Sequence, residues 1–253
     1  MKKITIIFGG NVGVYVYHFK TIKAIEDSLK CKIKRTGHFS FSTKVKNIFI
    51  DITFCYGPIK DGNYLKRKEL FALNEKEIIP QPAEIIAKKI GDTSLVLLLG
   101  LCGGLKGNKS EIYLPTEFRE ILFEQNYIKK EKVLPIKKLK RISLHNYLLE
   151  NMPGKKASAL TSNLTFQPKS IEKENTELLL DITNSLSKSI DVIDKESYQI
   201  VEKLKEKYPI GVMLMASDVL NKKRFMLKGN FKPNIKKFNA NCVRAIKVSL
   251  KRI

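Results

Sequence analysis

The stretch LVLLLGLCGGLKGNKS, residues 95–110, decides the fold. Leu95–Leu99 is an unbroken apolar run of strand length, which predicts a strand buried on both faces of a sheet. Glycines crowd the segment that follows, residues 100–104. Because glycine tolerates positive φ and lets other groups approach its backbone, we expect a tight turn there. Ligands of open α/β sheets bind at the carboxyl ends of strands, so this segment is a candidate site by its position.

The same stretch has the parts of a phosphate-binding loop but not their spacing. A P-loop requires GxxxxGK[ST], whereas Gly107 is followed by Asn108, and Lys109 and Ser110 come one residue late. The segment GGNVG, residues 9–13, also follows an apolar run. It lacks GxGxxG, and no acidic residue ends a second strand about 20 positions later. The chemistry of the site must therefore come from other strand ends.

Short apolar runs alternate with amphipathic segments along the rest of the chain. The runs predict strands at Ile4–Phe8, Asn47–Phe54, Ser94–Leu99, Ile112–Leu114, Ala157–Thr161, Ile190–Ile193 and Ile210–Ala216. Helical periodicity predicts helices at Phe19–Leu29, Pro82–Lys89, Ile171–Leu186, Ser197–Lys207 and Pro233–Lys251. This alternation predicts an α/β fold with a central mixed β-sheet flanked by helices. We expect a single domain over residues 1–253, with irregular regions at 57–82 and 129–156.

The composition favours a globular protein with a substantial core. The chain has 253 residues, of which 43% are hydrophobic. No apolar run approaches the roughly 18–20 residues of a membrane span. The N-terminal MKKITIIFGG is too short and too β-branched for a signal peptide. We therefore expect a cytoplasmic protein without a membrane partner.

The four cysteines, Cys31, Cys55, Cys102 and Cys242, are scattered and form no CxxC pair. Zinc-ligand spacing is absent, and a disulfide framework is not expected in a chain of this size. We expect reduced, mostly buried thiols, no metal site and no cofactor.

The net charge of +22 comes from lysines spread over nearly every segment. Three interpretations are open: a polyanion such as RNA, a lysine-rich surface composition, or attraction of a small anionic substrate such as a nucleotide. The even spread favours composition over a nucleic-acid partner. The segment 132–141, KVLPIKKLKR, is a local concentration.

Three further strand ends carry polar residues. They are TSNLTFQP (161–168), DVIDKES (191–197) and VMLMASD (212–218). Together with GLCGGL (100–105), their order and spacing resemble the nucleoside phosphorylase/nucleosidase superfamily. That family cleaves the N-glycosidic bond of nucleosides or nucleotides. The sequence Gly100-Leu101-Cys102-Gly103 is similar to its Gly-[Ser/Thr]-x-Gly turn, closest to the form in AMP nucleosidases. The stretch ending in Phe166, the segment Asp194-Lys195-Glu196-Ser197 and the pair Ser217-Asp218 resemble its other motifs.

The resemblance implies a role for each matching residue. Asp218 would protonate or hydrogen-bond purine N7, next to Ser217, and a carboxyl group with a raised pKa suits that role. Glu196 would bind the ribose hydroxyls and favour a cationic sugar. Phe166 would stack on the base, and Gly103 would let the ligand approach the backbone. Each residue also has a plainer interpretation.

Those plainer interpretations are structural. A Ser-Asp pair such as Ser217-Asp218 is common at a turn or a helix N-cap. Glu196 could complement the dipole of a helix from the surface. Phe166 could be a core residue.

The departures from the family pattern lie on the nucleophile side. The segment 10–14 has no arginine where phosphorylases grip phosphate, and the two other phosphate anchors correspond to Leu98 and Leu101. Hydrolysis is therefore favoured, although inorganic phosphate remains a candidate co-substrate, held by Lys20 or by a neighbouring subunit. Asn11 and His18 are the polar candidates near the nucleophile, and packing beside Tyr17 and Phe19 is the plainer interpretation of His18.

A lysine stands where the family has methionine. Lys195 beside the ribose would suit an anionic substituent such as a 5′-phosphate or a carboxylate, or its side chain could extend into solvent. Lys222, Lys223 and Arg224 could reinforce an anion site or form a solvated face.

We expect cleavage of the N-glycosidic bond of purine nucleosides or nucleotides, with hydrolysis ahead of phosphorolysis. The alternatives are a phosphate-dependent purine or uridine phosphorylase and a non-catalytic protein that binds nucleosides or RNA. The partner would be a small-molecule nucleoside or nucleotide, and family members are generally homo-oligomers, so we expect at least a dimer.

Overall fold

The structure is a computed structural model of the whole chain. It describes residues 2–9, 15–37, 40–58, 78–80, 83–122, 140–162, 181–220 and 234–253. For residues 15–19, 56–58 and 78–80 it describes the backbone alone.

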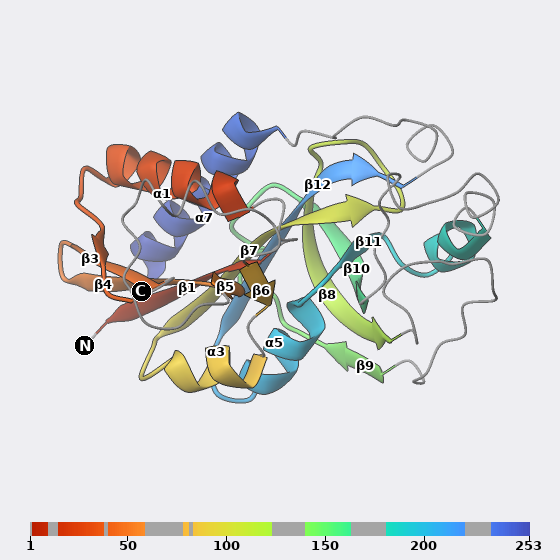
Figure 1. Cartoon of the computed structure of the whole chain (residues 1–253), viewed down its shortest axis with the longest axis horizontal. Helices are drawn as coiled ribbons and strands as arrows, with labels where there is room; N and C mark the ends of the chain where they lie inside the picture. Colours follow the sequence, from red (N-terminus) through yellow and green to blue (C-terminus); the bar gives the residue numbers. More distant parts are fainter. Residues whose placement is uncertain are drawn as a thin grey trace.

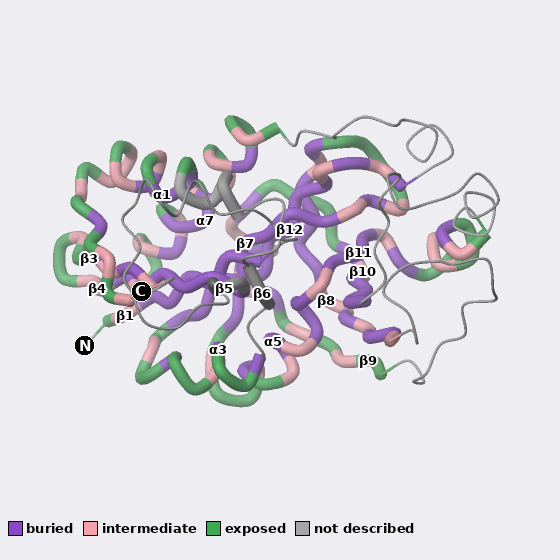
Figure 2. The backbone as a smooth tube through the Cα atoms, viewed as in Figure 1, coloured by how far each residue is buried: buried purple, intermediate pink, exposed green. Residues whose placement is uncertain are grey.

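Four parallel strands form the centre of a large mixed sheet (Figure 1). They are β4 (Ile48–Phe54), β1 (Lys3–Gly9), β7 (Leu95–Gly104) and β12 (Ile210–Val219), adjacent in that order. β7 is buried along almost its whole length, which explains its unbroken apolar sequence. Figure 2 shows the same strands as the buried interior of the molecule.

The second half of the sheet closes back on β7. β12 pairs with β8 (Ile112–Ile121), β8 with β10 (Lys155–Ser162), and β10 with β11 (Val192–Asp194). β11 then pairs antiparallel with the last residues of β7. Five strands thereby form a closed ring, in which the carboxyl end of β7 lies between β12 and β11 (Figure 1).

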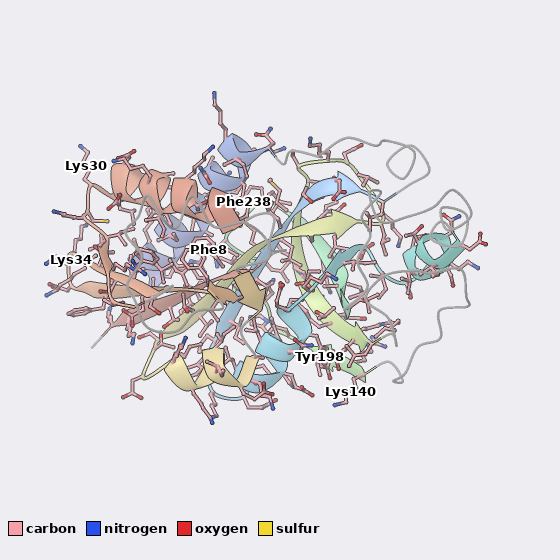
Figure 3. The ribbon with its side chains drawn as sticks, in the orientation of Figure 1. Phe8, Lys30, Lys34, Lys140, Tyr198 and Phe238 are labelled. Atoms are coloured by element: carbon pink, nitrogen blue, oxygen red, sulfur yellow. The ribbon has the colours of Figure 1, made fainter. Side chains whose placement is uncertain are left out.

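The remaining strands extend the edges. They are β2 (Lys34–Arg35), β3 (Ser40–Val45) and β9 (Lys140–Ser143) in the large sheet, and β5 (Tyr56–Pro58) with β6 (Ile78–Pro80) as a separate pair. β3 alternates between buried and accessible residues, as expected for a strand with one solvated face. Lys30 and Lys34 point into solvent at this end of the molecule (Figure 3).

Helices cover both faces of the parallel strands (Figure 1). α1 (Tyr15–Leu29) and α7 (Ile235–Arg252) pack together on one face, and α3 (Ala83–Lys89) and α5 (Ser197–Leu204) on the other. A further helix spans residues 181–187. α7 buries a stripe at helical spacing that includes Phe238, Cys242 and Ile246, as its sequence predicts. Within the described ranges, no helix is long and apolar enough to cross a membrane.

The predicted α/β class with a mixed central sheet and flanking helices is confirmed. Two predictions were wrong in extent. The segment 100–104 continues β7 instead of turning, and β8 runs through Pro115 to Ile121 instead of ending at Leu114. β2, β3 and β9 were missed because their short, lysine-bearing sequences carry little apolar signal.

Candidate functional site

The glycines of segment 100–104 serve close packing between strands. No positive φ occurs among them; of the glycines that the structure describes, Gly107 alone has one, at 77°. A Cβ on Gly100 would lie 3.2 Å from the Gly9 carbonyl oxygen, and one on Gly103 would lie 2.9 Å from Leu220 Cδ1. The expectation of a tight turn was therefore wrong. The glycine signal instead marks a strand end where neighbouring groups crowd the backbone.

Gly103 is the residue at which two acidic segments meet. It pairs with Asp218 of β12 on one edge of β7 and with Ile193 of β11 on the other. Because neighbouring strands lie about 4.8 Å apart, the main chains of Asp218 and Ile193 are about 10 Å apart across β7. Asp194 follows Ile193 directly, so carboxylates flank this strand end on both sides.

A β-bulge presents Asp218. The register of β12 against β7 shifts between Ala216 and Asp218, so Ser217 is the extra residue. The Ser217 hydroxyl lies 3.0 Å from the Cys102 carbonyl oxygen and 2.8 Å from Asp218 Oδ1, and it can donate to either. Asp218 is 9% exposed. The interpretation of this pair as a helix N-cap was wrong, because both residues belong to the strand.

Glu196 occupies the N-cap position of α5 but does not cap it. Its side chain makes no cap hydrogen bond, and the residue is 7% exposed. The interpretation as a surface residue at a helix start was therefore wrong. A Cβ on Gly9 would lie 3.5 Å from Glu196 Oε2 and 4.0 Å from Cys55 Sγ. The Glu196 carboxylate thus lies over the carboxyl end of β1, where the missing side chain of Gly9 leaves space.

Two neighbouring residues cap α5 instead. Thr161, at the end of β10, donates its hydroxyl to Asp194 Oδ1 at 2.8 Å, and the Ser197 backbone N–H donates to Asp194 Oδ2 at 3.0 Å. The Tyr198 N–H donates to Thr161 Oγ1 at 2.8 Å. The sequence analysis assigned no role to Thr161, the first residue of the motif TSNLTFQP. It quoted Asp194 as part of a motif but gave that residue no role of its own.

Two buried thiols lie among these carboxylates. Burial raises the pKa of Cys55, and the charges of Glu196 and Asp194 raise it further. Burial likewise raises the pKa of Cys102, reinforced by Asp194 and Asp218. Both thiols are therefore neutral near pH 7, and neither is a thiolate nucleophile. All four cysteines are free and three are buried, as predicted.

The segment that carries Glu196 holds two further perturbed groups. Burial raises the pKa of Asp194 to about 6, against the opposing effect of hydrogen bonds from Thr161 and Ser197. Burial lowers the pKa of the half-buried Lys195 to about 8, and the nearby Asp194 charge opposes this. Paired shifts of this kind are typical of functional sites.

The raised pKa of Asp194 predicts a pH-dependent stability. The carboxyl group of Asp194 binds its proton more tightly in the folded protein than in the unfolded chain. The contribution of Asp194 to the free energy of unfolding therefore falls as pH rises from about 4 to about 6, and is level above that. We expect the stability difference between wild type and Asp194→Asn, measured by urea unfolding, to fall over the same interval. A difference that stays constant from acidic to neutral pH would contradict the shift.

The other candidate residues divide into two groups. Leu98 and Leu101, at the positions of phosphate anchors, are buried in β7. Phe166, Asn11 and the cluster 222–224 lie outside the described residues, and His18 lies in α1 with its side chain outside them. The roles predicted for Phe166, Asn11, His18 and residues 222–224 therefore stay predictions. Across the described ranges, no three His, Cys, Asp or Glu side chains are grouped to hold a metal ion.

No protein-family model and no curated protein sequence matches the chain. Solved structures do match it over nearly full length. A 5′-methylthioadenosine/S-adenosylhomocysteine nucleosidase from Neisseria meningitidis, in complex with methylthio-immucillin-A, has a TM-score of 0.60 at 14% identity, covering 100% of both chains.

Two further nucleosidases of this kind agree with that match. The one from Helicobacter pylori has a TM-score of 0.58 at 13% identity, covering 99% of this chain and 98% of its own. A variant from Chlamydia trachomatis bound to methylthioadenosine has a TM-score of 0.56 at 11% identity, covering 100% and 99%. The chain therefore has the fold of the methylthioadenosine/S-adenosylhomocysteine nucleosidases, as its motif resemblance to the nucleoside phosphorylase/nucleosidase superfamily predicted.

Proposed function

We propose that this protein is an enzyme that hydrolyses the N-glycosidic bond of purine nucleosides or nucleotides. The observation that carries the proposal is the pairing of Gly103 with Asp218 on one side and with the β11 segment that leads to Glu196 on the other. The proposed acid for the base and the segment that leads to the proposed sugar carboxylate, far apart in sequence, therefore flank one strand end. Structures with this fold include nucleosidases with nucleoside analogues bound.

Asp218 would act on the leaving group. Negative charge moves onto the purine as the bond breaks, and a proton or hydrogen bond at N7 stabilises it. The position of Asp218 supports this role, because burial removes competing water and the Ser217 hydroxyl holds one carboxylate oxygen.

Glu196 would act on the sugar. A carboxylate that accepts hydrogen bonds from the ribose hydroxyls also stabilises the positive charge of the oxocarbenium-like transition state. Its burial supports this role, since charge interactions strengthen away from water. Within the same proposal, Phe166 would stack on the base and Lys195 would accept an anionic substituent of the sugar.

Water would be the nucleophile. Leu98 and Leu101 are buried apolar residues, so they offer no charge-assisted hydrogen bond to a phosphate dianion. Asn11 and His18 remain our candidates for orienting the water. No cofactor enters this reaction, and we place the enzyme in the cytoplasm as at least a homodimer; free, mostly buried thiols support a reducing compartment.

Base release with and without phosphate tests the proposal. The substrates are methylthioadenosine, adenosine, inosine and AMP, with the products followed by chromatography. We expect free base from at least one substrate in phosphate-free buffer, with a rate that phosphate does not raise. Release only with phosphate would identify a phosphorylase instead. Binding of these nucleosides without release under either condition would identify a non-catalytic binding protein.

A further inference from the structure

We propose that Asp194 is a positioning residue: it caps α5 in place of Glu196 and thereby holds the Glu196 carboxylate over the end of β1, where the ribose would bind. This inference rests on the proposed function and adds a residue to its machinery. It follows from which side chains satisfy the first N–H groups of α5.

The start of a helix leaves N–H groups without partners in the helix, and the side chain at the N-cap usually accepts one of them. Glu196 is the N-cap residue of α5, yet its carboxylate makes no such bond. Its Oε2 lies instead over the end of β1, beside the Gly9 backbone. A carboxylate used as a cap could not also lie there, so another acceptor must serve the helix.

Asp194 and Thr161 supply that acceptor. The Ser197 N–H donates to Asp194 Oδ2 at 3.0 Å, and the Tyr198 N–H donates to Thr161 Oγ1 at 2.8 Å. The Thr161 hydroxyl in turn donates to Asp194 Oδ1 at 2.8 Å. Both Asp194 oxygens and the threonine oxygen are thereby engaged, and all of these groups are buried.

The two residues also fix where α5 begins. Thr161 and Asp194 are register partners in neighbouring strands, so they hold the first turn of the helix against the sheet from two elements. Glu196 lies between Asp194 and Ser197 in the chain, and the backbone on both sides of it is held. A carboxylate placed in this way loses little freedom on binding a ribose, which is the purpose of a preorganised site.

A double-mutant cycle tests whether Asp194 acts through Glu196. We expect Glu196→Ala to lower kcat/KM for base release by about 100-fold and Asp194→Ala by about 10-fold or more. Because Asp194 acts through Glu196, we expect the double variant to equal Glu196→Ala within about threefold. Effects that multiply would show that Asp194 acts independently and would overturn the inference.

Two matched variants at Thr161 distinguish loss of the capping hydroxyl from general damage to the packing. Thr161→Ser keeps the hydroxyl that links Asp194 to Tyr198, so we expect kcat/KM near that of wild type. Thr161→Val keeps the shape but removes the hydroxyl, so we expect a loss like that of Asp194→Ala. Equal behaviour of the two variants would overturn the inference.

Hydrogen exchange tests the cap of α5 independently of any enzymatic activity. If the wild-type protein releases no base, the proposed function fails, but the capping arrangement still predicts protected amides at Ser197 and Tyr198. We expect Asp194→Ala to speed exchange at these amides by at least about tenfold while the amides of α7 stay protected. Unchanged exchange at Ser197 and Tyr198 would overturn the inference whether or not the enzyme is active.

Discussion

Replacing Asp218 with asparagine is expected to slow base release by about 100-fold or more, the usual contribution of a positioned general acid. The amide keeps the size of the side chain and an oxygen that can accept from Ser217, but it cannot give a proton to N7. The β-bulge at Ser217 that presents residue 218 depends on the backbone and should survive. Steady-state rates of base release, with circular dichroism and thermal unfolding as folding checks, measure the effect.

The matched control is Asp51→Asn. Asp51 lies in the middle of β4 and pairs with Lys3 at 2.7 Å, away from the carboxyl ends of the strands. We expect its rate to stay within about twofold of wild type, since isolated surface ion pairs contribute little. An Asp218→Asn variant that matches this control would remove Asp218 from the mechanism and leave the identity of the acid open.

Replacing Glu196 with glutamine is expected to lower kcat/KM by about 10- to 100-fold. Glutamine can still hydrogen-bond the ribose, but it removes the negative charge that favours the cationic transition state. The expected loss is the difference between charge-assisted and neutral hydrogen bonds, about 1–3 kcal/mol. Since the charge matters most in the transition state, the larger part should appear in kcat.

Glu202→Gln in the same helix is the control for that variant. Glu202 accepts from the Tyr198 hydroxyl at 3.1 Å in the second turn of α5, so its replacement tests damage to the helix without changing the Glu196 carboxylate. We expect kcat/KM near that of wild type. An unaltered kcat/KM in Glu196→Gln would show that the buried carboxylate is not used on the sugar.

Much of the fold could be predicted from local sequence. The unbroken apolar run at Leu95–Leu99 predicted a strand buried on both faces, and burial of that kind requires a sheet covered by helices on each side. The alternation of strands and helices predicted the α/β class. Predicted element boundaries were wrong where the local signal was ambiguous. The glycines of segment 100–104 were interpreted as a turn although they extend β7. Glycine suits both a positive φ and a close backbone approach, so its presence alone does not distinguish the two.

The candidate site was predicted only in part. Motif order pointed to Asp218 and Glu196. The structure places β12, which carries Asp218, and β11, which ends two residues before Glu196, on either side of Gly103. Thr161 could not be selected from local sequence, because it caps Tyr198 from 37 positions away in the chain. Asp194 caps Ser197 from only three positions away, but the motif resemblance assigned a role to Glu196 and none to Asp194. Gly9 was likewise overlooked, since its role is the space that it leaves for Glu196.

The sequence by itself determined most of the central strands and the covering helices, since hydrophobic periodicity is a property of neighbouring residues. Only the tertiary structure decided that β11 closes against the end of β7, that Ser217 forms a bulge, and that Thr161 joins the cap of α5. The physical reason is that strand register and hydrogen-bond partners are fixed by packing between elements distant in the chain. That packing also decides that the Glu196 carboxylate lies over the end of β1 and does not cap its own helix.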